Sequence, residues 1–471
     1  MGDYANPSRQ PTQFGGGRAV SPYTAHPMSQ LLPRLRVELG ALAVLAGPLI
    51  AHNLAMAAMM FVDAVMAGHL SARALGAVAI GGAVFWPGFG FAMGLLMALT
   101  ATVAHLYGAG ALDRIGHYRR QAQWLALAAG LALMVVLWCV EPLLVAIGTA
   151  PELVAPTTGY LQALSLGMPA VCLYQTLRFT SEGVGRTSPL IGMALLGVAC
   201  NVVGNWLLMW GNLGLPQLGA TGCGLATAIS YWIMYFALRH HLRRHPFYAP
   251  FTLFERREAP HWPALRELLA LGVPIGVMVF MESSAFAAAA LMLGTLGAAT
   301  VAGHQVALNW AAFMFMVPLG LGMATTIRVG HALGGGDRAA ARFAGWTGIG
   351  ASTAFMLGSA LVMLAARELI VGIYTSDAAV AAVAIGLLVW AALFQVADGI
   401  QVSTASALRG FKDTEVPALI TVFAYWGVGL TLSWWLGLHL GLGPQGVWMG
   451  LTASLVVAAG LLVWRLTRVS R

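Results

Sequence analysis

The chain has 471 residues, of which 59% are hydrophobic and only 9% are charged. Soluble domains carry about a quarter of charged residues, so this composition excludes an ordinary soluble protein. The net charge is +8, and arginine supplies almost all of the positive charge. The charged residues flank long apolar runs. We therefore expect a lipid bilayer as the partner of the chain, and no nucleic acid.

The apolar residues form runs of roughly 20 or more, the length that crosses a bilayer as a helix. A membrane β-barrel would instead show alternating segments of about ten residues. Residues 1–32 are polar and rich in Pro, Gly, Ser and Gln, which predicts a disordered cytoplasmic tail. The predicted fold of the rest is an all-α polytopic membrane protein with twelve transmembrane helices. These cover about residues 38–66, 76–104, 121–146, 158–180, 188–210, 218–240, 266–293, 303–330, 345–371, 380–408, 416–437 and 444–466.

Positive charge alternates between the connections. The connections that follow even-numbered spans hold most of the arginine, whereas the others hold only Arg73 and Arg367. Because positively charged connections stay on the cytoplasmic side, this pattern predicts that both chain ends are cytoplasmic. An even number of spans is required for that arrangement.

The two halves of the chain resemble each other at a nearly constant offset. VAHLYGAGALDR (103–114) resembles VGHALGGGDR (329–338), which relates His105 to His331. With an even number of spans in each half, the pattern predicts two six-helix bundles related by a pseudo-two-fold axis. We expect an N-terminal bundle over 33–240, a cytoplasmic linker over 241–265 and a C-terminal bundle over 266–471. The repeated histidines suit a structural role, since a catalytic residue is rarely duplicated in both bundles.

Two acidic residues, Glu282 and Asp398, lie deep inside predicted spans, and Asp63 lies in the first span near its outer end. Inserting a carboxylate at the centre of a span costs on the order of 3 kcal/mol, and such groups are functional by default. They suit a carrier of protons or sodium, or a partner for a cationic substrate. The alternative is a structural ion pair, for which His52 and His304 are the candidate partners.

Polar and aromatic residues in the same spans are candidates for a substrate cavity. Gln305 and Asn309 are four residues apart and share a helix face, and we place Gln305 in the cavity. Asn201 and Asn205 have the same spacing, for which interhelical hydrogen bonding is the alternative to substrate binding. Aromatic side chains such as Phe280 suit bulky apolar cations, although packing and interfacial belts use the same residues.

No pattern in the sequence indicates an enzyme. The four cysteines lie in apolar stretches without metal-ligand spacing, and neither a nucleophile elbow nor a zinc-protease motif occurs. We therefore expect no cofactor and no enzymatic activity.

Four segments together resemble the multidrug and toxic compound extrusion (MATE) family, and within it the NorM-like bacterial branch. They are FVDAVMAGHL (61–70), PIGVMVFMES (274–283), AGHQVALN (302–309) and DGIQVSTASALRGFKDTEVP (398–417). The resemblance covers roughly residues 35–465 in order. It implies an antiporter of the bacterial inner membrane that exports organic cations in exchange for inward sodium or protons. We expect a monomer, since two bundles that rock against each other need no second copy.

The resemblance also implies roles for particular residues. Glu282, Asp398 and Asp63 would couple the ion, with a possible sodium site at Glu282 and Asp398. Of the substrate-binding candidates, the resemblance supports Asp63, Gln305 and Asp377. The residue patterns described above add Phe280, Phe315 and Asn201. At Phe315 some relatives carry a tyrosine that helps the cation site, and the loss of that hydroxyl favours protons over sodium.

Three other functions are alternatives. A flippase for a lipid-linked precursor has a related architecture, but it would need a basic cavity for pyrophosphate, and the acids inside these spans disfavour one. An integral membrane enzyme and a receptor that does not transport have no dedicated motif here.

Overall fold

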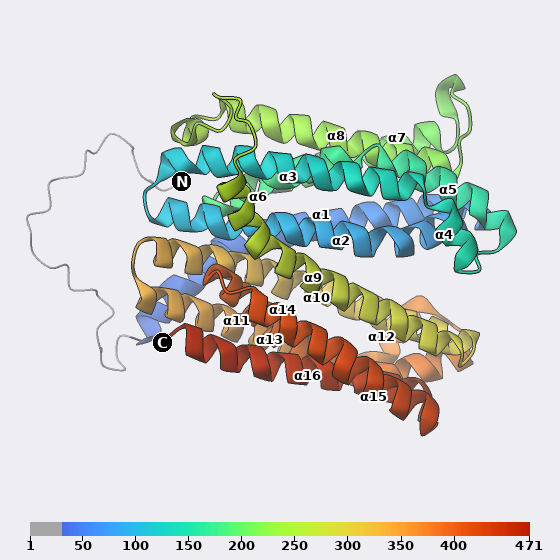
Figure 1. Cartoon of the computed structure of the whole chain (residues 1–471). Helices are drawn as coiled ribbons and strands as arrows, with labels where there is room; N and C mark the ends of the chain where they lie inside the picture. Colours follow the sequence, from blue (N-terminus) through green and yellow to red (C-terminus); the bar gives the residue numbers. More distant parts are fainter. Residues whose placement is uncertain (1–30) are drawn as a thin grey trace, which may run out of the picture.

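The computed structural model describes residues 31–471, and within this range every regular element is a helix. The tail predicted over residues 1–32 lies outside the described residues, except that Leu31 and Leu32 begin the first helix. The helices form two groups, drawn in Figure 1 as an upper blue-to-green group and a lower yellow-to-red group. The all-α fold is confirmed.

The first group holds the helices up to the middle of the chain. Its long helices are α1 (Leu31–Leu70), α2 (Ala72–Gly108), α3 (Leu112–Trp138), α5 (Pro151–Ser165), α6 (Met168–Gly183), α7 (Ser188–Leu208) and α8 (Ala220–Arg244). Short segments, α4 (Glu141–Ala146) and η2 (Asn212–Gly214), lie in the connections.

The second group repeats this pattern. It contains α9 (Trp262–Gly294), α10 (Ala298–Gly334), α11 (Arg338–Ala365), α12 (Arg367–Tyr374), α13 (Ala378–Gly410), α14 (Glu415–Val422), η4 (Phe423–Leu430), α15 (Thr431–Trp434), η5 (Trp435–His439) and α16 (Gly443–Val469). The segments from α14 to η5 form one continuous span, in which η4 and η5 are π-helical.

The fourth span is broken into α5 and α6. Pro169 stands in the first turn of α6 and lacks a backbone N–H, so it cannot continue a helix from Ser165, the last residue of α5. Eleven other spans in the described part of the chain are long and apolar enough to cross a membrane. With the α5–α6 pair they make the twelve predicted spans.

The linker between the groups is shorter than predicted. Helix α8 continues to Arg244 and α9 begins at Trp262, with the short helix η3 (Pro246–Phe251) between them. The linker packs against α3, where the Arg119 guanidinium donates to the Leu253 carbonyl at 2.9 Å and the Trp124 indole donates to the Glu258 carbonyl at 3.0 Å.

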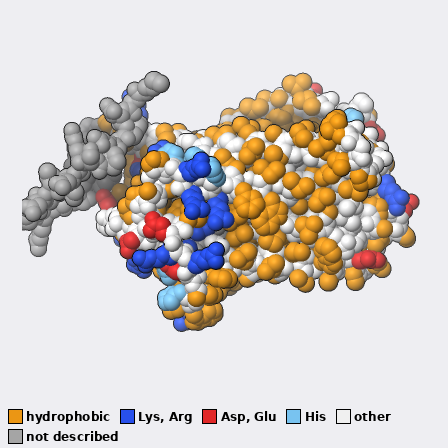
Figure 2. Space-filling model, turned by 90° about the horizontal axis from the view of Figure 1, so that it is seen from above, with side chains coloured by type: hydrophobic (Ala, Val, Ile, Leu, Met, Phe, Trp, Pro, Cys, Tyr) orange, Lys and Arg blue, Asp and Glu red, His pale blue; other side chains and the backbone are white. Residues whose placement is uncertain are grey.

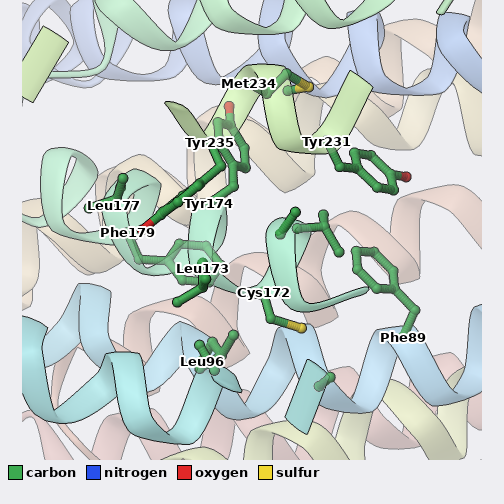
Figure 3. Close-up of a cluster of buried hydrophobic side chains, with 14 of the residues drawn as sticks. Phe89, Leu96, Cys172, Leu173, Tyr174, Leu177, Phe179, Tyr231, Met234 and Tyr235 are labelled. Atoms are coloured by element: carbon green, nitrogen blue, oxygen red, sulfur yellow. The ribbon is translucent and has the colours of Figure 1, made fainter. Parts of the chain in front are cut away.

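Apolar side chains cover both the inside and much of the outside of the molecule. Inside the first bundle, α2, α6 and α8 bring together side chains such as Phe89, Cys172 and Met234 (Figure 3). On the outside, hydrophobic side chains spread over the length of the helices, whereas Lys and Arg gather mainly near one end (Figure 2). This surface fits a bilayer with a basic edge.

The two bundles meet along α2 with α10 and along two further helix pairs, α2 with α9 and α1 with α10. Glycines allow the last two contacts: a Cβ on Gly94 would lie 2.7 Å from the Gly276 Cα, and one on Gly320 would lie 2.5 Å from Ile50 Cγ1. Gly94 corresponds to Gly320, and Ile50 to Gly276, by the same sequence offset that relates the two repeated histidines. The contacts are therefore related by the repeat, which gives the predicted pseudo-two-fold arrangement.

The molecule has two unlike ends. We call the end that holds Leu31 and Arg471 the terminal end, and the opposite one the distal end. Toward the distal end the two groups of helices diverge (Figure 1). Near the terminal end the Arg328 guanidinium of α10 donates to both carboxylate oxygens of Glu38 in α1, at 2.8 and 2.6 Å.

Candidate functional site: two acidic clusters, one in each bundle

The second bundle brings Glu282 of α9 and Asp398 of α13 close enough for their charges to interact. Asp398 is 7% exposed, and its buried Oδ1 has no hydrogen-bond partner among residues 31–471. Glu282 is partly exposed. A buried carboxylate oxygen without a donor is costly, so this pair suits a site that a proton or a cation completes.

A third oxygen at this site comes from Tyr425, in the π-helical segment η4. Its hydroxyl lies against Glu282 and within electrostatic reach of Asp398. Tyr425 is 1% exposed, and no group in the described chain hydrogen-bonds its hydroxyl at ordinary geometry. Oxygen-bearing side chains from three helical segments therefore converge, and among the described residues the Asp398 Oδ1 has no hydrogen-bond partner.

Two phenylalanines cover this site on its distal side. Helices α9 and α13 run in opposite directions, so Phe286 lies one turn distal to Glu282 and Phe394 lies one turn distal to Asp398. Their ring centroids are 5.8 Å apart in an edge-to-face contact, and Phe286 also meets the Tyr425 ring at 6.3 Å. The rings separate the acid pair from the distal end of its own bundle.

The first bundle holds the second acidic cluster, around Asp63 of α1. Its Oδ1 accepts hydrogen bonds from Asn201 and Asn205 of α7 at 3.0 and 2.6 Å, and its Oδ2 accepts one from Thr227 of α8 at 3.1 Å. Asp63 is 5% exposed. This carboxylate differs from the acid pair because donors already satisfy both of its oxygens.

The other predicted substrate residues lie on α9, on α10 and at the start of α13. Gln305 is exposed on the same face of α10 as Asn309, and Phe315 is partly exposed on the same helix. Phe280 of α9 is 37% exposed. Asp377 caps α13 by accepting from the backbone N–H of Ala379 at 2.8 Å, about 30 Å along that helix from Asp398 at 1.5 Å per residue.

In the described residues, neither His52 nor His304 forms the alternative structural ion pair with one of the three acids. The His52 ring bonds the Leu190 carbonyl at 3.2 Å. The His304 ring accepts from the Trp448 indole N–H at 3.2 Å. Each histidine is therefore engaged away from the three acids.

Sequence reasoning missed two polar groups. Tyr425 gave no signal beyond a single tyrosine in an apolar run. Glu182 was placed in a connection because the fourth span was predicted to end at residue 180. Helix α6 in fact continues to Gly183, and Glu182 is fully buried there, with the Arg178 guanidinium donating to it at 2.6 Å.

The described residues contain no group of three or more His, Cys, Asp or Glu side chains arranged to hold a metal ion. A sodium site at Glu282 and Asp398 would therefore need further oxygens, and the Tyr425 hydroxyl is the nearest candidate from another helix. The donor chemistry fits, since hard cations prefer oxygen ligands.

Comparisons with known proteins agree with this architecture. The chain is 44% identical over 452 residues to the "Multidrug resistance protein PmpM" of Pseudomonas aeruginosa, covering 95% of this chain and 94% of that protein. It is 42% identical over 446 residues to a "Probable multidrug resistance protein NorM" of Xanthomonas campestris, covering 95% and 97%. The printed names describe those two proteins.

Solved structures share the fold. The crystal structure of the eukaryotic MATE transporter AtDTX14 superposes with a TM-score of 0.85 at 20% identity, covering 93% of this chain and 98% of that one. A structure described as the outward-facing conformation of a multidrug resistance MATE family transporter superposes with a TM-score of 0.82 at 20% identity, covering 91% and 95%.

A family model described as MatE matches residues 48–207 and 274–435, once in each bundle. The two matched ranges together span more than half of the chain. The first contains Asp63, Asn201 and Asn205, and the second contains Glu282, Asp398 and Tyr425. Such a protein is a transporter rather than an enzyme, as the absence of catalytic motifs had indicated. This chain belongs to the MatE family, the multidrug and toxic compound extrusion transporters.

Proposed function

We propose that this protein is a secondary active antiporter that exports organic, mostly cationic, amphipathic compounds in exchange for inward sodium or protons. The observation that carries the proposal is the pair of Glu282 and Asp398 inside the second bundle, with the Tyr425 hydroxyl beside it. Relatives at 42–44% identity are named multidrug resistance proteins. The acids inside the membrane favour cationic substrates over the pyrophosphate of the flippase alternative.

Coupling would arise from competition for the acidic sites. A sodium ion or proton that occupies the acid pair removes negative charge, which weakens the attraction for a cationic substrate. When the ion leaves, the charge returns and substrate binding becomes favourable. Such coupling requires that the ion and the substrate stabilise different states of the protein.

We place the terminal end on the cytoplasmic side of a bacterial inner membrane. The support is the basic edge seen in Figure 2 together with the arginines of the connections at this end. The substrate residues in this proposal are Asp63, Gln305, Asp377, Phe280, Phe315 and Asn201. The protein would work as a monomer without a cofactor.

The test is dye transport by the purified protein in proteoliposomes, with ethidium as the probe and a sodium gradient or a pH gradient imposed separately. Glu282→Gln should abolish transport driven by either gradient while the protein still inserts and purifies normally. Glu141→Gln is the matched control, since Glu141 is an exposed acid on the short helix α4. Undiminished dye transport by the Glu282→Gln protein would contradict the proposed role of the acid pair.

A further inference from the structure

Two histidines make the same bond in opposite directions across the interface between the bundles. His105 Nε2 of α2 lies 2.7 Å from the carbonyl oxygen of Gly410, the last residue of α13. His331 Nε2 of α10 lies 2.7 Å from the carbonyl oxygen of Gly183, the last residue of α6. Each bond joins one bundle to the other near the terminal end.

These two bonds are related by the internal repeat. The donors His105 and His331 correspond in the two halves, and the acceptors Gly183 and Gly410 correspond to within a single position. By contrast, the ion pair of Glu38 and Arg328 at the same interface has no repeat-related copy, because the corresponding positions hold Ala264 and Thr102. Both halves of the chain therefore carry the histidine bond, whereas the neighbouring ion pair occurs in only one copy.

Near the two histidines, glycines allow the backbones of α2 and α10 to lie close together. A Cβ on Gly108 would lie 2.2 Å from the His331 carbonyl oxygen, and a Cβ on Gly334 would lie 2.1 Å from the His105 carbonyl oxygen. Gly108 and Gly334 are separated by the same sequence offset as the two histidines. Helices α2 and α10 therefore touch backbone to backbone at this place, which any larger residue would prevent.

The acceptors are suited to a bond that forms and breaks. The last carbonyls of a helix have no partner within that helix, so the histidines supply the partner while the bundles are together. When the bundles separate, water can take over the same carbonyl oxygens and the histidine nitrogens. Because water replaces each lost partner, opening leaves no buried polar group unsatisfied.

We propose that His105 and His331 are a two-fold-related pair of latches that hold the two bundles together at the terminal end, and that both release their glycine carbonyls when that end opens. The pair sets the balance between the closed and open states of this end. The inference concerns the movement of the bundles, and it stands apart from the substrate and from the coupling ion.

The test measures the distance between the bundles by electron–electron double resonance, with spin labels at Asp113→Cys and Ala339→Cys. Both positions are exposed at the terminal end, and they are repeat-related residues of different bundles. The labels are introduced after the four native cysteines have been replaced by alanine. His105→Phe and His331→Phe keep a ring of similar size but remove the N–H donor.

Each phenylalanine variant should raise the ratio of the long-distance to the short-distance population by between about two-fold and about ten-fold, the effect of one hydrogen bond. The double variant should raise the ratio further than either single variant, although the two effects need not multiply because the histidines lie close together. His105→Gln and His331→Gln, which restore a donor, should return the ratio toward that of the unmodified protein. His69→Phe is the control, because the exposed His69 bonds only within its own helix, to the Val65 carbonyl.

A latch role is overturned if the two phenylalanine variants keep the distance distribution of the unmodified protein. It is equally overturned if His69→Phe shifts the distribution as much as they do. Should a phenylalanine variant fail to fold, the glutamine variant and a His→Asn variant, whose shorter side chain cannot reach the carbonyl, provide the same comparison. Dye transport is not needed for any of these readings, so a failure here is separate from a failure of the proposed function.

Discussion

The acid pair of the second bundle is unusual because its chemistry is incomplete. Glu282 and Asp398 lie close together in an apolar bundle, and the Asp398 Oδ1 and the Tyr425 hydroxyl are buried without hydrogen-bond partners among the described residues. Two like charges and unused oxygens in a low-dielectric setting are unfavourable unless a cation or a proton joins them. These residues are therefore suited to binding a cation or a proton.

Removing the Tyr425 hydroxyl should weaken this site without destroying it. In Tyr425→Phe the two carboxylates remain, but one oxygen that could contact the ion is lost. We expect the concentration of coupling ion needed for half-maximal dye transport to rise by about ten-fold, the usual effect of one hydrogen bond or ligand.

The measurement is the initial rate of dye transport in proteoliposomes across a series of ion concentrations. Tyr374→Phe is the control, since Tyr374 is 45% exposed at the end of α12. A Tyr425→Phe protein whose ion dependence matches that of the control would exclude the hydroxyl from the site.

The residues at this scale show what the sequence could predict. Glu282, Asp398 and Asp63 were identifiable because each is a carboxylate within an apolar run. The spacing of Asn201 and Asn205 indicated interhelical hydrogen bonding, but it did not identify Asp63 as the partner. Tyr425 was not identifiable, since tyrosine is common in membrane spans and only the packing of α9, α13 and η4 brings its hydroxyl to the acids. Site residues that stand out by their own side chain were predictable. Site residues that belong to the site only because of helix packing were not.

Among the elements, the paired helices at the bundle interface depend on glycine. Gly94 of α2 faces Gly276 of α9, where an added Cβ would lie 2.7 Å from a backbone Cα. Backbone atoms cannot move aside as the end of a flexible side chain can. We expect Gly94→Ala to push α2 from α9 and to lower dye transport by at least about ten-fold, because overpacking a close contact costs about 1–3 kcal/mol and would distort the interface between the bundles.

Gly350→Ala is the matched control for this substitution. Gly350 also lies inside a long helix, α11, but nothing lies within 4 Å of the Cβ that it would gain. Alanine there should keep transport and should stabilise the helix by about 0.5–1 kcal/mol, because glycine is the poorer helix former. Equal transport by the two alanine variants would show that the close contact is dispensable.

The linker is held on α3 by an ion pair outside the membrane spans. The Arg120 guanidinium donates to Glu258 at 2.6 Å, and His117 lies 2.7 Å from the same carboxylate. The hydrogen bond from Arg120 is the main reason that the pKa of Glu258 is lowered from its ordinary 4.5 to about 2. A lowered pKa means that this contribution to docking is present above pH 4.5 and is lost as the pH falls toward 2.

Glu258→Gln should therefore loosen the linker at neutral pH as acid does for the unmodified protein. The exposed Arg256 and Arg257 offer trypsin a site within the linker. We expect faster cleavage there in the variant than in a Glu255→Gln control, since Glu255 is exposed on the same segment. Quantitative electrophoresis of the two bundle-sized fragments measures the rate, and identical rates in the two variants would argue against the ion pair as the fastening.

The helices themselves were largely predictable, since long apolar runs and flanking arginines mark most of them. Their irregular parts were not. The break at Pro169 lay inside one apolar run, and the π-helical turns of η4 and η5 have no composition that distinguishes them from an α-helix. These local departures arise where helices must fit their neighbours, and one of them carries Tyr425.

For the whole molecule, the two acidic clusters differ in what an ion would have to displace. Donors from α7 and α8 already satisfy the Asp63 carboxylate, so an ion there must break hydrogen bonds. In the acid pair the Asp398 Oδ1 has no hydrogen-bond partner among residues 31–471, so an ion there adds a contact. We infer that ion binding stabilises the protein mainly through its second bundle.

This inference predicts how the thermal stability responds to sodium. A ligand that binds only the folded protein stabilises it by about 2.7 kcal/mol at one hundred times its dissociation constant. If sodium is the coupling ion, the unfolding temperature in detergent should rise with sodium chloride and not with choline chloride at equal ionic strength. The rise should vanish in Glu282→Gln and persist in Asp63→Asn, even though Asp63→Asn lowers the starting stability by disturbing three hydrogen bonds. A rise that instead vanishes in Asp63→Asn would move the ion site to the first bundle, and no sodium-specific rise in the unmodified protein would leave the proton as the coupling ion.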